Sequence, residues 1–350
     1  MIVDRRICLK AMSLGAAATL VSGQTLFAQA QASSETAGSD IIDQRTQKAI
    51  DSGLEFLSRT QNESGSFNQG PYKENVAVVS LTGLAFMSEG SIPGQGKYAL
   101  QMRRCLEFIL ANCQPNGFIT ARGFQSHGPM YGHGFATLFL AEVYGTAPSS
   151  EIREKLERAV GLIIDTQNEE GGWRYQPQRS DADISVTICQ VMALRAARNA
   201  GIYVPNMTID NCVEYVKKSQ NPDGGFMYLL DGGESAFPRS AAGVVALFSA
   251  GVYEGKEIEL GLKYLMGYLP EQQQRLRESH YFYGHYYAVQ AMWHAGGNYW
   301  EKWYPAIRED LLRRQQSDGS WMDGISPEYG TAMACIILQM PNNYLPIFQR

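Results

Sequence analysis

The sequence has no run of basic residues and no Cys-x-x-Cys pair. Its 350 residues carry 30 lysines and arginines against 35 aspartates and glutamates, which gives a net charge of −5. Without a basic stripe, nucleic acids and anionic membrane surfaces are poor partners. The six cysteines are irregularly spaced, so we expect no disulfide framework and mostly buried thiols. With 45% hydrophobic residues, the chain can build a large folded core.

Residues 1–32 have the features of an export signal. Arg5 and Arg6 are followed by an apolar position and Lys10, a pattern close to the twin-arginine signal. A short stretch rich in alanine, glycine, serine and threonine comes next, and small-x-small sites at 28–32 suit cleavage. We therefore expect export to the periplasm or another extracytoplasmic compartment, and a mature domain of residues 33–350.

A repeat of about 53 residues organises the mature chain. Gln61, Gln114, Gln167 and Gln220 are spaced by 53 residues, and each begins a motif that ends in glycine and an aromatic residue. Another copy begins at Gln315, and a decayed copy is expected near residues 269–271. The glycines and neighbouring polar residues are turn formers, so we assign the motif a structural role. Six such repeats fill residues 33–350 as one domain.

Each repeat contains two predicted helices. The first is amphipathic, as in residues 42–57, 152–166 and 209–219, which predicts a helix with one face in solvent. The second is apolar on nearly every side, which predicts a buried helix, at 76–87, 135–144, 186–197, 243–250, 286–295 and 331–340. Neither terminal repeat resembles the polar cap that an open solenoid needs. We therefore predict an all-α fold, a closed (α/α)6 toroid with outer amphipathic and inner apolar helices.

The starts of the inner helices are expected to form a polar ring around one mouth of the toroid. They carry Glu74, His127, His133, Asp181, Asp183, Arg239, His280, His285, Glu328 and Tyr329. Aromatic residues follow on the same helices, so a pocket with polar groups at one end and an apolar body is expected. The same aromatic residues could instead simply fill the ring.

The Gln…Gly-Gly-Trp/Phe motifs resemble the repeats of squalene–hopene cyclases and of protein prenyltransferase β subunits. Residues 131–137 and 286–291 are similar to exported bacterial prenyltransferase/squalene oxidase repeat proteins. The resemblance covers the mature chain. It implies an acid-initiated cyclase, because triterpene cyclases protonate a C=C bond with the middle aspartate of Asp-x-Asp-Asp-Thr. Here Asp183 matches that aspartate and Asp181 the first one, whereas Ile184 replaces the third and Ser185 the threonine.

On this interpretation Asp183 is the proton donor, and Asp181 and His133 tune it. The expected ligand is a hydrophobic small molecule, with an isoprenoid as the expected class, and no cofactor is expected. The predicted ligand-binding residues are Tyr131, Phe135, Arg239, Tyr283, His285, Tyr286, Trp293 and Tyr329. Aromatic faces can stabilise carbocations. Alternatively, Asp183 or Ser185 is a helix N-cap without a catalytic role.

Three further alternatives remain open. His127, His133 and Asp183 could meet in adjacent repeats and bind zinc, but their spacing matches no recognised pattern, so no metal is predicted. The Asp-x-Cys of zinc-dependent prenyltransferases is also absent. A non-catalytic toroid could bind a lipid, a peptide or a protein partner. A carbohydrate-active (α/α)6 enzyme could use Asp183 and Glu328 as its two carboxylates.

Overall fold

The computed structural model describes residues 41–67, 72–121, 128–270 and 279–349. Residues 45–350 belong to one compact unit, which contains the helices described below apart from Gln44, the first residue of α2. The predicted export signal, His127 and residue 271 of the decayed motif lie outside the described residues. None of the described helices is both long and apolar enough to cross a membrane.

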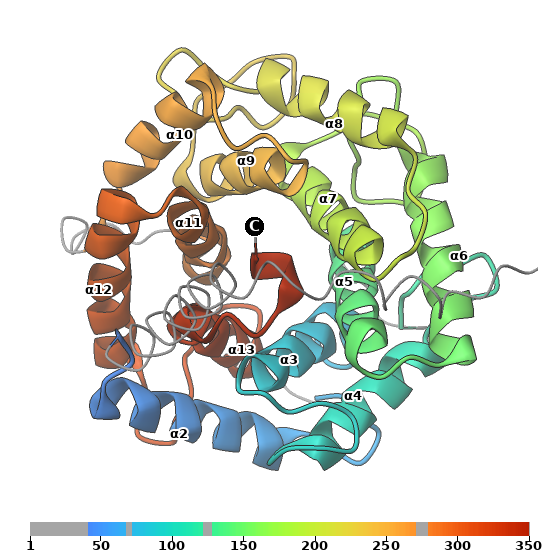
Figure 1. The fold of residues 1–350 in the computed structure, drawn as a ribbon, viewed down its shortest axis with the longest axis vertical. Helices are drawn as coiled ribbons and strands as arrows, with labels where there is room; N and C mark the ends of the chain where they lie inside the picture. Colours follow the sequence, from blue (N-terminus) through green and yellow to red (C-terminus); the bar gives the residue numbers. More distant parts are fainter. Residues whose placement is uncertain (1–40, 68–71, 122–127, 271–278, 350) are drawn as a thin grey trace, which may run out of the picture. The chain divides into compact units, whose positions relative to one another are not determined.

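In the described part of this unit, twelve α-helices alternate between an outer and an inner ring (Figure 1). The outer helices are α2 (Gln44–Thr60), α4 (Ala99–Ala111), α6 (Ser150–Thr166), α8 (Asn206–Lys218), α10 (Lys256–Met266) and α12 (Gly297–Arg314). The inner helices are α3 (Val76–Ser88), α5 (Pro129–Thr146), α7 (Ile184–Asn199), α9 (Phe237–Ser249), α11 (Tyr281–Ala295) and α13 (Pro327–Leu338).

The inner helices close into a ring. Each packs against the next along the chain, from α3 to α13, and α13 packs back against α3 (Figure 1). Across the same seam, Arg45 of α2 forms an ion pair of 2.8 Å with Glu309 of α12. The predicted all-α toroid is therefore confirmed, and the outer–inner pairs agree with six repeats.

Burial follows the predicted division between the two kinds of helix. In α3 every residue except Ala77 is buried, whereas α6 buries one face and exposes its charged residues. Helix α3 begins at Val76 as predicted, whereas the other inner helices begin earlier, for example at Pro129 instead of Phe135 and at Phe237 instead of Gly243. Their first turns contain polar residues and proline, which an apolar criterion excludes although proline suits the first turn of a helix.

Four motif glutamines join their repeat to the next one around the ring: Gln61, Gln167, Gln220 and Gln315. The Gln61 side-chain amide donates to the Gly65 carbonyl within its turn and to the Gln101 carbonyl in the next outer helix. Gln167, Gln220 and Gln315 make the equivalent pair of bonds in their repeats. Gln315 reaches the Ala49 carbonyl of α2, so the ring closes with the same contact that joins consecutive repeats.

The motif glycine permits close contact at these seams. Gly65 has a φ of 87°, and a Cβ placed on it would lie 2.1 Å from the Arg104 carbonyl oxygen. A side chain at this position would therefore separate the turn from α4.

Repeat two departs from the predicted register by one residue. Cys113, not Gln114, lies four residues before the positive-φ Gly117, the position that glutamine has in the other motifs. Its antiparallel bridge to Ile119 corresponds to the bridge between Gln220 and Phe226. A cysteine cannot donate two amide hydrogen bonds. At this seam the Lys155 ammonium donates to the Leu110 carbonyl at 2.9 Å.

His133 is part of the same seam. Its Nδ1 accepts the Ile119 amide at 3.2 Å, as Thr187 and Ser240 hydroxyls accept the amides of Trp173 and Phe226 in other repeats. Its Nε2 lies 3.2 Å from the Ala159 carbonyl. One nitrogen must therefore accept and the other donate, which only the neutral imidazole can do. Burial lowers the pKa of His133 to about 4.

Replacing Gln315 by leucine tests the closing seam. We expect a loss of about 1–3 kcal/mol in the free energy of unfolding, because two carbonyls lose their donor. Urea denaturation measures it. The matched control is Gln316→Leu, since Gln316 is exposed and its amide reaches only the Arg314 carbonyl within its own repeat. Equal effects of the two substitutions would contradict this role for Gln315.

The neutral, buried His133 predicts a loss of stability in acid. Its pKa of about 4 lies below the ordinary histidine value, so the unfolded chain binds the proton more tightly. The stabilisation is complete above about pH 6.5 and is lost between 6.5 and 4, by roughly 3 kcal/mol. Urea titrations across this pH range measure the free energy of unfolding. His133→Thr should be less stable than the wild type at pH 7, but its free energy of unfolding should fall less between pH 6.5 and 4. An unchanged pH dependence in the variant would argue against a buried neutral imidazole.

Candidate functional site

Asp183 begins inner helix α7 at the mouth formed by the N-terminal ends of the inner helices. It is fully buried, and its Oδ1 accepts the Val186 amide at 2.9 Å and the Ser185 hydroxyl at 2.5 Å. The alternative interpretation of Asp183 as a helix N-cap is thus confirmed. Its neighbours indicate what else the carboxyl group can do.

The second oxygen of Asp183 faces an arginine. Oδ2 lies 3.6 Å from the Arg174 guanidinium, and the exposed Asp181 carboxylate lies 3.5 Å from the same nitrogen. The guanidinium covers the rings of Tyr175 and Tyr228, with centroids at 4.7 and 5.3 Å. The two tyrosine hydroxyls are hydrogen-bonded to each other. Asp181 and Asp183 therefore share one cation.

A chain of hydroxyl groups connects Asp183 to the ring interior. Because the Ser185 hydroxyl donates its one proton to Asp183, it must accept from the Tyr131 hydroxyl, 2.5 Å away on α5. From the facing helix α11, the Tyr283 hydroxyl donates to the Ser185 carbonyl at 2.8 Å. We call Tyr131, Arg174, Asp181, Asp183, Ser185 and Tyr283 the Asp183 cluster.

Opposing effects act on the proton affinity of Asp183. Burial raises the pKa of its carboxyl group, and this outweighs the bonds from Ser185 and Val186 and the charge of Arg174, which lower it. Burial also raises the pKa of Tyr131, so its hydroxyl stays protonated and can donate. The cluster therefore places a buried carboxyl group beside three groups that stabilise its charged form.

Aromatic side chains from facing helices meet in the ring interior. Tyr131 and Tyr283 approach edge to face at 6.5 Å between ring centroids, and Phe135 and Tyr286 at 6.1 Å. Tyr286 is fully buried, whereas Tyr131 and Tyr283 are half-buried. Side chains thus fill the space between α5 and α11 at the level of Phe135, and the accessible aromatic surface lies at the mouth. Tyr329, on α13, is also buried.

The remaining predicted site residues do not belong to the Asp183 cluster. His133 binds Ile119 and Ala159 at the seam, so neither ring nitrogen is available to Asp183. His285 packs between Phe237, Tyr281 and Trp303, the last on outer helix α12. Arg239 donates to the carbonyls of Phe226 and Glu234. Trp293 donates to the Phe348 carbonyl near the C-terminal ends of the inner helices.

Sequence analysis missed Arg174, Tyr175 and Tyr228. A signal was present, because Tyr175 and Tyr228 each follow a motif aromatic by two residues and are 53 residues apart. Arg174 occupies a position that is neutral in the neighbouring repeats, where Thr120 and Met227 stand. A charged residue at a position that is neutral in the neighbouring repeats, such as Arg174, indicates a role that the repeat structure alone does not require.

A metal centre has no support in the described residues. They contain no group of three or more histidine, cysteine, aspartate or glutamate side chains that could hold an ion. Glu328, the second carboxylate of the carbohydrate hypothesis, lies in the first turn of α13. It is fully buried, and neither of its carboxylate oxygens has a hydrogen-bond partner.

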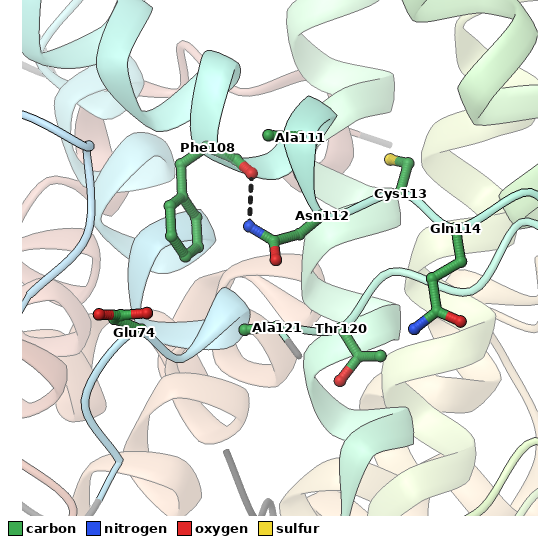
Figure 2. A pocket seen from close by; sticks show the side chains of 8 residues that line it. All are labelled: Glu74, Phe108, Ala111, Asn112, Cys113, Gln114, Thr120 and Ala121. Carbon is green, nitrogen blue, oxygen red and sulfur yellow. Dashed lines mark hydrogen bonds between the residues drawn. The ribbon is translucent and has the colours of Figure 1, made fainter. Parts of the chain in front are cut away.

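A separate pocket of about 420 Å³ lies outside the Asp183 cluster, between the end of α4, the turn that follows it and Glu74 (Figure 2). Its lining combines a carboxylate, amides, a thiol and a hydroxyl with few apolar groups: Glu74, Phe108, Ala111, Asn112, Cys113, Gln114, Thr120 and Ala121. Such a lining suits a polar molecule and does not suit an isoprenoid chain.

Comparisons with solved structures agree on the fold. The type II terpene cyclase MstE from Scytonema is 15% identical over 86% of this chain and 99% of its own, with a TM-score of 0.61. An inactive variant of the α-1,6-mannanase GH76A of Salegentibacter, in complex with α-1,6-mannotetrose, is 9% identical over 86% and 99%, with a TM-score of 0.62. A protein from Actinoplanes is 14% identical over 85% and 99%, with a TM-score of 0.60.

At these identities the structural matches show the fold alone. The sequence has no match among curated proteins. The profile of the prenyltransferase α/α-toroid domain matches residues 36–280, which is more than half of the chain. The chain therefore belongs to the prenyltransferase α/α-toroid domain family.

Proposed function

We propose that this toroid binds a hydrophobic small molecule of the isoprenoid class at the mouth beside the Asp183 cluster. The observation that carries the proposal is the meeting of two half-buried tyrosines, Tyr131 and Tyr283, from opposite sides of the ring. Their rings offer apolar surface to a prenyl chain, and the buried Phe135–Tyr286 pair forms the floor beneath them.

The comparisons add support of a general kind. MstE has also been solved with geranylgeranyl dihydroxybenzoate, its substrate. A prenylated molecule combines an apolar chain with a polar head group, and the mouth offers both environments. The chain would lie on the tyrosine rings, and the head group would face Arg174 and Asp181, whose side chains reach solvent. We further propose that the protein acts outside the cytoplasm, after removal of residues 1–32.

Ligand binding is tested with a fluorescent geranylgeranyl analogue and its displacement by geranylgeraniol. We expect Tyr283→Ala to weaken binding at least tenfold, because it removes one face of the mouth. Tyr203→Ala is the matched control, since Tyr203 is 81% exposed on the loop before α8. Equal affinity in the two variants would place the ligand elsewhere. A lack of displacement by geranylgeraniol would exclude this class of ligand.

A second candidate function is acid-initiated cyclisation, which the buried carboxyl group of Asp183 favours. Its proton would move to a carbon of a C=C bond and leave a tertiary carbocation, which aromatic faces such as those of Tyr131 and Tyr283 can stabilise. The resulting carboxylate would be held by Ser185, the Val186 amide and Arg174. The Tyr131–Ser185 hydroxyl pair offers a path for returning the proton.

Catalysis is tested by incubating the mature protein with squalene and C15–C30 prenyl substrates and analysing the products by mass spectrometry. Asp183→Asn should abolish cyclised products while leaving the protein folded, because asparagine also caps helices well. Asp181→Asn should only reduce the rate, since Asp181 acts through Arg174. Retained activity in Asp183→Asn would exclude this aspartate as the acid. If the wild type forms no cyclised product, cyclisation is excluded for these substrates and only the proposed binding function remains.

A further inference from the structure

The chain returns into the ring after α13, at the end opposite the Asp183 cluster. Two short 3-10 turns, η2 (Met340–Asn342) and η3 (Pro346–Phe348), follow the helix. Between them Asn343 has a φ of 52°, a left-handed conformation that asparagine tolerates better than most residues. Residues 344–349, which we call the tail segment, then run into the middle of the inner ring (Figure 1).

Three inner helices hold the tail segment by its main chain. Glu142 of α5 accepts the Ile347 amide. Trp293 of α11 donates its indole N–H to the Phe348 carbonyl at 3.1 Å, and Arg195 of α7 donates to the Gln349 carbonyl. These are contacts to peptide groups of three successive residues. The inner helices therefore recognise the backbone of a segment that forms a single 3-10 turn.

The side chains of the tail segment divide between the ring and solvent. Leu345, Ile347 and Phe348 are 1, 2 and 3% exposed, whereas Tyr344 and Pro346 are exposed. Apolar contacts and main-chain hydrogen bonds therefore act together on this turn.

Glu142 has unused hydrogen-bonding capacity in this site. It is 3% exposed, and its Oε2 has no hydrogen-bond partner. Burial raises the pKa of Glu142 to about 8, although the Ile347 amide and the charge of Arg195 lower it, so the carboxyl group is mostly protonated at neutral pH. The uncharged form suits a site lined by Phe348 and Ile347.

We propose that this end of the toroid is a peptide-binding site and that the tail segment is its displaceable occupant. The ligand class is a short peptide that forms one 3-10 turn and buries apolar residues beside the peptide groups that Glu142, Trp293 and Arg195 bind. The tail segment has these features and occupies the site as part of the same chain. The site lies at the other end of the ring from the proposed isoprenoid site and does not depend on it.

The test uses a chain that ends at Asn343 and a fluorescently labelled peptide with the sequence of residues 344–349. Fluorescence anisotropy should show saturable binding to the truncated chain and at least tenfold weaker binding to the full chain, whose site is occupied. In the truncated chain, Arg195→Ala should weaken binding at least fivefold. Arg198→Ala, on the same helix, is the matched control, because Arg198 binds Val204 and Asn206 instead.

A folded truncated chain that does not bind the peptide would overturn the proposal, and so would equal effects of the two arginine substitutions. If truncation prevents folding, hydrogen exchange in the full chain decides. We expect Arg195→Ala to speed exchange of the Ile347–Gln349 amides at least tenfold without changing exchange in the inner helices. Exchange of these amides only together with the inner helices would show that the tail segment is part of the core.

Discussion

The ring relies on a hydrogen-bonded contact that recurs at four of its seams, the glutamine amide that joins two backbone carbonyls of neighbouring repeats. In Gln61 and Gln315 the same amide donates within its own turn and to the neighbouring outer helix. An amide NH₂ group has two donors in a fixed plane, so it sets the distance and angle between neighbours together. The angles between repeats must add up to a full turn, and α13 meets α3 although the seam after repeat two has Lys155 in place of the glutamine contact.

Much of this fold could be predicted from the sequence because the repeat contains both helix types and their order. The apolar pattern separated inner from outer helices, and the lack of capping repeats favoured closure. The exact alignment of the motif in repeat two was not predicted correctly. Gln114 was placed in the motif because it continues a spacing of 53, whereas packing selects Cys113, four residues before the glycine that must adopt positive φ. The position of the positive-φ glycine, and not the position of the glutamine, therefore determines how repeat two aligns with the other repeats.

The candidate site was only partly predictable, for a different physical reason. Asp183 was expected at the mouth because it begins an inner helix, and Ser185 joins it there to Tyr131. His133 was expected beside Asp183, but an imidazole can also replace the hydroxyl that accepts a turn amide, and in repeat two it does. Arg174 was missed because the turn motif was treated as purely structural. A residue at a seam and a residue at a mouth can be neighbours in sequence and still face different environments.

The seam between α12 and α2 has a consequence for how the molecule reaches this state. Its glutamine contact spans 266 positions of the chain, whereas the equivalent contact of Gln61 spans 40. Consecutive repeats can therefore pair while the chain is still growing or partly folded, but the closing contact must wait until the intervening repeats are in place. Bringing such distant segments together costs more entropy and slows folding. The ring should thus pass through an open arc, whose exposed apolar ends make it the stage most prone to joining another molecule.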